Sequence, residues 1–342
     1  MQNQNTSGLT SKEKRIILVL LAAIGLVLAM LVYLLQGNSS ADQDPALVVV
    51  PTATAAPALR DNDPAPAMVL PTETPAVVDP TIDPSLLLSP TPTAFDPKDW
   101  ASLPLVPAAN SQIREIYLKG LALGNNPNSF SKIGDCNSLD PYFLSYFDLG
   151  NKAYNLGAYS YLAPVIQEFD GSFKRVSEAV GNGFNTSAVL SPFRANPDDC
   201  KTGETPLDCE YRLHKPSFAL ISIGTDDYIS QAKYEANMRQ ILDITIQRGI
   251  VPILVTKMDN ANQLDYNPII AKLAEEYNVP LINLWSALQP LPDHGLMDKI
   301  HPSGYTDGFV FSPTNLSRYG WPVRNLAFLQ GLYAVWTQAN QE

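Results

Sequence analysis

The sequence contains few cysteines, few charged residues and no basic tract. Its 342 residues include 3 cysteines, 3 histidines and 17% charged residues. Three cysteines are too few for a small fold built on disulfides, and a mean hydropathy of −0.05 excludes a protein made of many membrane helices. A net charge of −11 without a run of Lys or Arg argues against nucleic acid as a partner.

A long apolar stretch lies near the N-terminus. Residues 16–35 carry no charge and as a helix would span roughly 30 Å, the thickness of the hydrocarbon core of a bilayer. Basic residues precede this stretch, so we expect residues 1–15 to be a cytoplasmic tail and the rest of the chain to lie outside the cell. A cleaved signal peptide is the alternative, but its apolar region is usually shorter and its cleavage site would be poor here. The sequence therefore favours a single-pass anchor in the cell membrane.

Proline is concentrated in the next segment, since 14 of the 29 prolines lie between residues 41 and 107. They alternate with Thr, Ala and Asp, so the segment cannot bury enough apolar surface to offset the entropy cost of ordering it. We expect residues 36–107 to be a disordered Pro/Thr-rich stalk, made semi-rigid by polyproline II segments. The stalk would hold residues 108–342, one extracytoplasmic domain, away from the membrane.

From residue 108 onward, apolar runs alternate with turn signals. Helical periodicity covers residues 111–123, 233–247, 268–277 and 325–336, and short apolar runs typical of strands cover residues 130–133, 218–223, 251–255 and 279–282. Alternating strands and helices predict parallel pairing, and continuously apolar strands predict a sheet covered on both faces. We therefore expect a three-layer, doubly wound, flavodoxin-like α/β fold, in which reactive groups gather at the carboxyl ends of the strands.

Three short blocks carry residues suited to catalysis. Gly134-Asp135-Cys136-Asn137 follows the first strand, Gly224-Thr225-Asp226-Asp227 follows the second, and Asp298-Lys299-Ile300-His301 lies in a loop before the last helix. Each block alone is a weak signal, because Gly-Asp after a strand is usually a turn and a single Asp-x-x-His is usually incidental. Their order along the chain is the more specific feature.

In this order the blocks resemble those of the SGNH (GDSL-type) hydrolase family. That family places its nucleophile in a Gly-Asp-Ser block and forms an oxyanion hole with a glycine amide and the Asn of a Gly-x-Asn-Asp block. An Asp-x-x-His block supplies its base and the carboxylate that orients it. The resemblance covers about residues 125–337 and includes a glycine block at residues 183–186. It implies an SGNH-hydrolase-like fold and an esterase that uses no cofactor and no metal.

Carried across by position, the resemblance implies that Cys136 is the nucleophile, His301 the general base and Asp298 the carboxylate that orients the base. Gly183 would donate its backbone N–H to the oxyanion. A thiol attacks well when a neighbouring imidazole takes its proton and a carboxylate fixes the tautomer of that imidazole. Ser138 lies two residues beyond Cys136 and is a weaker nucleophile candidate, because the turn would have to change shape.

The sequence departs from the family pattern at two positions. Cys136 stands where the family has Ser, and a thiolate is itself a strong nucleophile. Asp226 stands where the family has the oxyanion Asn, and an ionised carboxylate cannot donate a hydrogen bond to an oxyanion. Two functions therefore stay open. One is a hydrolase of ester bonds, such as O-acyl groups of a polysaccharide or lipid; the other is a catalytically degenerate surface module that binds glycan or another envelope ligand.

The other cysteines and histidines have structural alternatives. Cys200 and Cys209 flank a short loop rich in turn residues, and outside the membrane such a pair is a disulfide candidate. A pairing that uses Cys136 stays open and would remove the nucleophile. No pair of Cys or His residues has the compact spacing of a zinc site, so no metal is expected. His294 is either a cleft residue or an ordinary loop residue.

Aromatic residues follow both the nucleophile block and the Asp-x-x-His block. Four of them come soon after Cys136, where the pattern favours packing into the core over the wall of a pocket: Tyr142, Phe143, Tyr146 and Phe147. Residues 303–315 form a second stretch rich in Gly and aromatic residues. Long aromatic loops at the carboxyl ends of the strands of a sheet often cover a site.

Overall fold

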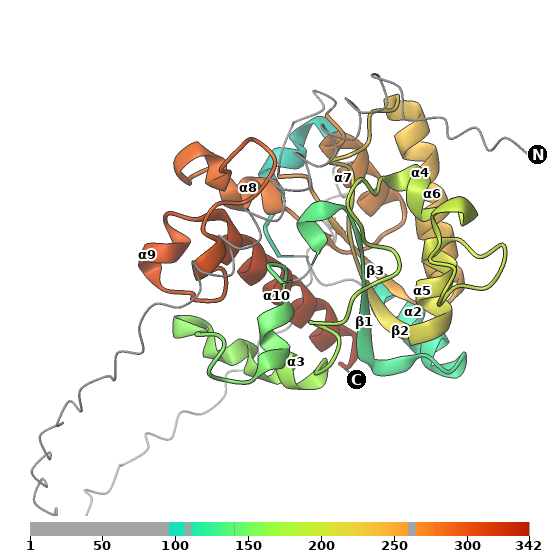
Figure 1. Ribbon diagram of the computed structural model, residues 1–342, viewed down its shortest axis with the longest axis horizontal. Helices are drawn as coiled ribbons and strands as arrows, with labels where there is room; N and C mark the ends of the chain where they lie inside the picture. The colour runs from blue at the N-terminus through green and yellow to red at the C-terminus, as the bar shows by residue number, and fades with distance from the viewer. Residues whose placement is uncertain (1–95, 107–110, 140, 259–264, 342) are drawn as a thin grey trace, which may run out of the picture. The chain divides into compact units, whose positions relative to one another are not determined.

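The computed structural model describes residues 96–106, 111–139, 141–258 and 265–341. Within these ranges the chain forms a four-stranded parallel sheet with helices on both faces (Figure 1). The strands, in their order across the sheet, are β1 (Asn126–Gly134), β2 (Pro216–Ser222), β3 (Val251–Val255) and β4 (Leu281–Ile282). The predicted α/β class and the parallel pairing are confirmed.

A single bridge on the outer side of β1 makes the sheet doubly wound. Val180 pairs in parallel with Gly134, and the Gly134 N–H donates to the carbonyl oxygen of Ala179 at 3.1 Å. Because Gly134 also pairs with Ser222 of β2, the bridge must lie on the opposite edge of β1. The order across the sheet is therefore Val180, β1, β2, β3, β4, and the direction of winding reverses between β1 and β2. Ligands of such sheets bind beyond the carboxyl ends of the strands at this reversal.

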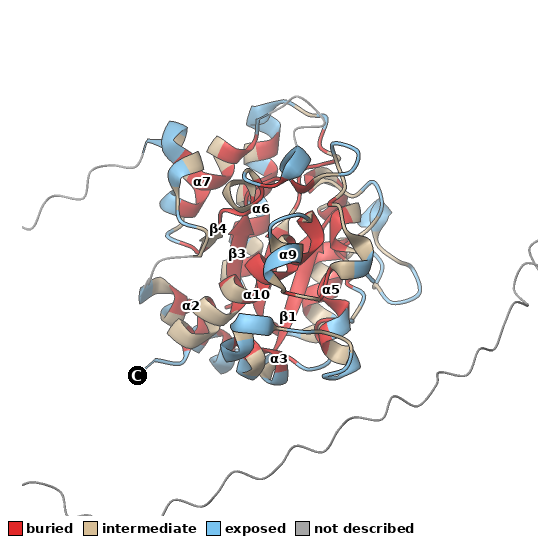
Figure 2. Ribbon diagram, turned by 90° about the vertical axis from the view of Figure 1, so that its left-hand side faces the viewer, coloured by how far each residue is buried: buried red, intermediate tan, exposed pale blue. Residues whose placement is uncertain are grey.

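Different helices cover the two faces of the sheet. One face packs against α2 (Ser111–Ala122), α3 (Ala163–Glu168) and α10 (Gly320–Ala339). The other face packs against α5 (Pro206–His214), α6 (Gln231–Gln247) and α7 (Asn267–Glu276). Figure 1 shows α10 and α6 on opposite sides of the strands, and Figure 2 shows the strands buried between the two helical layers. Neighbouring strand residues such as Leu220 and Ile221 belong to different clusters because successive side chains point to opposite faces.

Short helices and 3₁₀ turns make up most of the connections. The short helices are α4 (Thr186–Val189), α8 (Leu284–Leu288) and α9 (Pro313–Leu316). The 3₁₀ turns are η2 (Pro97–Ser102), η3 (Cys136–Ser138), η4 (Ser145–Leu149), η5 (Gly157–Leu162), η6 (Pro192–Arg194), η7 (Pro292–Gly295) and η8 (Tyr305–Asp307). Several of these turns lie at the carboxyl end of the sheet, where they carry the candidate site.

The long helices have the ends that their sequences favour. Helix α6 is capped by Ser230, whose hydroxyl accepts from the Lys233 N–H, and it buries an apolar stripe that includes Met238 and Ile241. Helix α10 begins at Gly320, earlier than the predicted residue 325, and includes Pro322 in its first turn. Proline is tolerated there, since the first backbone N–H groups of a helix have no partner within the helix.

Part of the predicted stalk packs on the domain. Trp100 of η2 lies edge-on to Trp285 of α8, with ring centroids 4.8 Å apart. The amide of Asn283 donates to the carbonyl oxygens of Trp100, Ala101 and Leu103 at 2.8–3.3 Å. Residues 97–103 are therefore ordered by contacts with the loop before α8, which sequence composition does not reveal.

The rest of the predicted stalk, together with the predicted tail and membrane anchor, lies outside the described residues. Among the helices that the structure does describe, none combines the length and the apolar character needed to cross a bilayer. The prediction of an anchor at residues 16–35 is therefore still a prediction.

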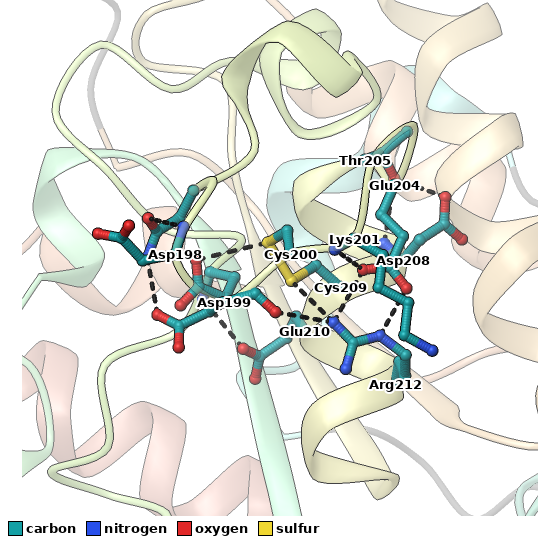
Figure 3. The surroundings of a disulfide bond; sticks show 12 residues. Asp198, Asp199, Cys200, Lys201, Glu204, Thr205, Asp208, Cys209, Glu210 and Arg212 are labelled. Atoms are coloured by element: carbon teal, nitrogen blue, oxygen red, sulfur yellow. Dashed lines mark hydrogen bonds and ion pairs between the residues drawn. A yellow bond between two sulfur atoms is a disulfide. The ribbon is translucent and has the colours of Figure 1, made fainter.

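Cys200 and Cys209 form a disulfide, as the sequence favours, and Cys136 is outside it (Figure 3). The bond links the loop before α5 to that helix, which is also held by an ion pair between Arg212 and Glu204. Disulfides typically contribute about 2–4 kcal/mol to stability. The carboxylate of Glu178 lies 3.8 Å from the Cys200 sulfur, but sulfurs bonded to each other are not thiolate ligands for a metal.

Candidate active site

Hydrogen bonds join the three predicted blocks at the carboxyl edge of the sheet. The carboxylate of Asp135 accepts from the Thr225 N–H at 3.2 Å, which ties the turn after β1 to the turn after β2. The side-chain amide of Asn137 donates to the carbonyl oxygen of Ile300 at 3.3 Å, which ties the first turn to the late loop. The expectation that these segments meet at one rim of the sheet is confirmed.

Cys136 begins the short turn η3 directly after β1. Asp135 caps this turn by accepting from the Asn137 N–H at 3.1 Å. A Cβ at Gly134 would lie only 2.3 Å from the Ser138 hydroxyl, so the turn closes too tightly for any other residue there. Ser138 is buried against this backbone and is not presented to a substrate, whereas Cys136 is partly exposed. Of the two nucleophile candidates, the structure therefore supports Cys136.

The late loop is folded around the carboxylate of Asp298. One oxygen accepts from the backbone N–H groups of Ile300 and His301, at 3.1 and 2.8 Å. The other oxygen lies 2.8 Å from Nδ1 of the His301 ring. Lys299 adopts a φ of +72°, a conformation that a non-glycine residue rarely adopts and that the surrounding bonds must hold in place. Asp298 thus fixes both the backbone and the ring orientation of His301.

The thiol of Cys136 and the ring of His301 are in contact. The Cys136 sulfur lies 3.7 Å from Nε2, which is hydrogen-bond distance for sulfur. A carboxylate only accepts hydrogen bonds, so Nδ1 must carry the proton that faces Asp298, and Nε2 is left to accept a proton from the thiol. The His301 and Asp298 side chains are 35% and 44% exposed, so a substrate can reach them. Cys136, His301 and Asp298 therefore form a continuous line of contacts from thiol to ring to carboxylate.

The pKa of Asp298 is lowered from its ordinary value of 3.8, first by the hydrogen bond from the His301 backbone and further by that residue's ring. A lowered pKa means that the carboxylate stabilises the folded loop above its unfolded-state pKa. That contribution is lost only as the pH falls through the lower, folded-state value. Asp298 is therefore mostly ionised once the pH exceeds its ordinary pKa of 3.8, and it is not the group that sets an acid limb of activity near neutral pH.

The Asp298→Asn variant is expected to reduce kcat/KM for an ester by about 10- to 100-fold. The expected reduction is smaller than for a fully buried triad carboxylate, because solvent screens the charge of the exposed Asp298 side chain. The amide retains an acceptor for the backbone N–H groups, so the thermal midpoint should change little. Steady-state kinetics with a short-chain ester and a melting curve of the same sample test both statements. An unchanged kcat/KM would show that Asp298 does not orient the base.

The glycine block lies beside the turn after β2. The side-chain amide of Asn185 donates to the Asp226 carbonyl oxygen at 3.3 Å, and the Thr186 hydroxyl donates to the Asp227 carboxylate at 2.7 Å. Asp227 is buried, and burial raises its pKa against the opposing effect of the Thr186 hydrogen bonds. Asp226 is only partly buried. Gly183 has a φ of +68°, and its role as oxyanion donor stays a prediction, as does the position of Asp226 in the oxyanion hole.

The main residue that sequence analysis missed is Arg324. It is the only charged residue of α10 and is 1% exposed. Its guanidinium donates to the Asn137 carbonyl oxygen at 3.1 Å and approaches the hydroxyls of Ser138 and Ser222 at 3.4 and 3.5 Å. The rings of Phe143 and Phe328 lie 4.7 and 4.6 Å from it. The available signal in the sequence was a lone arginine in an apolar helix. In the structure Arg324 holds the turn η3 that carries Cys136.

A small polar cavity behind the turn is lined in part by Asp135, Asn137, Lys257 and Arg324. Its volume of about 10 Å³ is close to the space that one water molecule needs. It is therefore too small to be the substrate site. His294, the other histidine near the late loop, has its Nδ1 3.2 Å from the Gln289 carbonyl oxygen and is an exposed loop residue.

No protein-family model matches the sequence, and no curated protein matches it. Similar solved structures include a GDSL-like lipase from Bacteroides thetaiotaomicron, with 12% identity and a TM-score of 0.37 over 65% of this chain and 97% of that chain. They also include a catalytic mutant of an acetylxylan esterase from Geobacillus stearothermophilus, with 16% identity and a TM-score of 0.38 over 61% and 95%. A psychrotrophic esterase from Pseudoalteromonas sp. has 12% identity and a TM-score of 0.38 over 60% and 97%. Similarity at this level says nothing about activity.

Proposed function

We propose that this chain is an SGNH-like hydrolase that cleaves ester bonds with a thiol nucleophile. The observation that carries the proposal is the line of contacts from sulfur to carboxylate. The Cys136 sulfur lies 3.7 Å from one ring nitrogen of His301, and the other ring nitrogen lies 2.8 Å from Asp298. This arrangement provides a nucleophile, a base that can take its proton, and a carboxylate that fixes the tautomer of the base.

The reaction would proceed in two acyl transfers. His301 takes the thiol proton of Cys136, and the sulfur attacks the ester carbonyl carbon to form a tetrahedral intermediate. The intermediate expels the alcohol oxygen, which receives the proton from His301, and leaves an acyl group on sulfur as a thioester. His301 then takes a proton from water, the oxygen attacks the thioester, and the carboxylic acid leaves while Cys136 regains its proton.

We also propose that the domain works outside the cell membrane, held by the apolar segment at residues 16–35 and by the stalk. The uncharged run and its basic flank support an anchor with a cytoplasmic N-terminus. The Cys200–Cys209 disulfide supports an oxidising compartment, since such bonds are rare in the cytosol. The substrate would then be an ester or glycan ligand outside the cell.

A short-chain ester assay on the full chain tests the proposed activity. Wild type should release p-nitrophenol from p-nitrophenyl acetate, and the Cys136→Ala variant should lose that release down to the uncatalysed rate. The variant removes only a sulfur from a partly exposed turn, so a matching melting curve is expected. Equal rates for wild type and Cys136→Ala would contradict a thiol nucleophile.

The carboxylate at position 226, beside the glycine block, is the observation that favours the alternative, a surface module without turnover. If Asp226 occupies an oxyanion position, its charge opposes the developing negative charge of the intermediate. Asp226→Asn should then raise kcat/KM for p-nitrophenyl acetate by about 10- to 100-fold, because it replaces an acceptor with a donor. An unchanged rate would show that Asp226 does not face the reacting carbonyl. No turnover by wild type or by Asp226→Asn would favour the binding module.

A further inference from the structure

The four aromatic residues that follow Cys136 in the sequence divide into two pairs with different surroundings. Phe143 and Phe147 are 1% and 3% exposed and pack into the core. Tyr142 and Tyr146 are 43% and 38% exposed. The sequence favoured core packing for all four, and the structure corrects this for the two tyrosines, since their rings remain accessible to solvent.

Each exposed tyrosine rests on an aromatic residue of the loop that follows His301. The ring of Tyr142 lies 4.4 Å from the ring of Tyr305, at an angle of 65°. The ring of Tyr146 stacks on Phe309 at 4.4 Å, with an angle of 7°. We call Tyr142, Tyr146, Tyr305 and Phe309 the tyrosine shelf. The shelf joins the same two segments of the chain that supply the Cys136 and His301 contact.

The shelf is held by a buried asparagine and a strained turn. Leu144 has a φ of +63°, an unfavourable conformation for a branched side chain. Its backbone N–H donates to the side chain of Asn325 at 3.1 Å. The amide of Asn325 in turn donates to the carbonyl oxygens of Tyr142 and Gly308, at 3.1 and 2.9 Å. One fully buried side chain thus fixes both loops, and backbone strain maintained in this way is concentrated at functional sites.

The shelf is close along the chain to Cys136 and His301. Tyr305 follows His301 by four residues, and its ring packs near Trp321, with centroids 5.9 Å apart. The pKa of Tyr305 is raised, chiefly by burial and in smaller part by the charges of Asp298 and Cys136. Tyr142 likewise follows Cys136 by six residues, so each residue of the Cys136–His301 contact is followed closely along the chain by one ring of the shelf.

We propose that the tyrosine shelf binds sugar rings of a glycan whose O-acyl group is cleaved at Cys136. The proposal rests on the hydrolase function proposed above and selects a polysaccharide over a lipid as the substrate. A phenol ring offers an apolar face to the C–H groups of a sugar ring, and its hydroxyl can bond the sugar hydroxyls. An acyl chain would instead need an apolar groove without polar tips. The presence of tyrosine, and not phenylalanine, at both exposed positions favours the sugar.

The test compares two substrates on the full chain. The probes are p-nitrophenyl acetate and partly acetylated cellohexaose, xylohexaose and chitohexaose. For the Tyr142→Ala/Tyr146→Ala variant, the ratio of kcat/KM for the best acetylated oligosaccharide to kcat/KM for p-nitrophenyl acetate should fall about tenfold, as expected for the loss of two ring contacts. Tyr161→Ala is the matched control, since this tyrosine is as exposed but packs near Tyr333 of α10. Its ratio should stay at the wild-type value.

Two kinetic outcomes would overturn the proposal that the shelf binds sugar rings. One is an unchanged ratio in the double variant, and the other is an equal loss with p-nitrophenyl octanoate, which would assign the shelf to an acyl chain. If wild type hydrolyses none of the probes, the hydrolase proposal fails separately, and calorimetric binding of the unacetylated oligosaccharides decides on the shelf. Binding by wild type that is lost in the double variant and kept in Tyr161→Ala supports it. Absence of binding by wild type overturns it.

Discussion

The His301→Ala variant is expected to reduce kcat/KM for p-nitrophenyl acetate by about 10³- to 10⁴-fold, because general-base catalysis by a positioned imidazole contributes effects of this size. The ring lies 3.7 Å from the Cys136 sulfur, so its removal also takes away a base that can accept the thiol proton. Alkylation of Cys136 by iodoacetamide at pH 7 should therefore slow by about tenfold. This second readout does not depend on knowing the substrate.

His294→Ala provides the matched control for this prediction. His294 lies in the preceding turn η7 and contacts the Gln289 carbonyl oxygen. Its removal should leave both the esterase rate and the alkylation rate at wild-type values. Equal effects of the two substitutions would mean that the losses come from the loop as a whole and not from a base at position 301.

Arg324→Ala is expected to lower the free energy of unfolding by about 3–5 kcal/mol. The substitution empties space between the rings of Phe143 and Phe328 and removes the donor that reaches the Asn137 carbonyl oxygen. Both losses fall on buried groups, where an unmet hydrogen bond costs more than at the surface. Urea denaturation followed by tryptophan fluorescence measures the change. A decrease in the free energy of unfolding below 1 kcal/mol would contradict the account of Arg324 as the group that holds the turn η3.

Arg324→Lys separates the charge from the geometry of the guanidinium. An ammonium keeps the positive charge but lacks the planar fork that bonds several oxygens at once. It should therefore recover only part of the stability. Activity corrected for the folded fraction should also remain below wild type, because the nucleophile turn is held less firmly. Full recovery by Lys would show that charge alone matters at this position.

The sequence was informative for structural elements that depend on residues close together along the chain. The strand at residues 218–223, the helix at 233–247 and the disulfide loop follow from apolar periodicity, turn signals and short spacing, and the structure confirms all three. The convergence of Cys136 and His301 was predictable for a similar reason. In a parallel sheet the carboxyl ends of the strands meet at one edge, so the order of the blocks sets their place.

Contacts between distant segments were not predictable from local pattern. Asn325 and Arg324 occupy adjacent positions on one apolar helix, and only the folded chain shows that they hold two different loops. Tyr142 and Phe143 are likewise neighbours with opposite surroundings, because the turn at Leu144 has a left-handed backbone that no periodicity indicates. Trp100 belongs to a Pro-rich segment by composition, yet it packs against Trp285.

The most direct measurement is the location of the acyl group during turnover. Wild type is mixed with p-nitrophenyl acetate, quenched with acid in the steady state and analysed by peptide mass spectrometry. The account predicts one acetyl group on the peptide containing Cys136, released by neutral hydroxylamine as a thioester is, and increased occupancy in Asp298→Asn if deacylation slows more than acylation. Turnover with the acetyl group on Ser138 or any other residue, or with Cys136 never acylated, would contradict a thiol nucleophile at the end of β1.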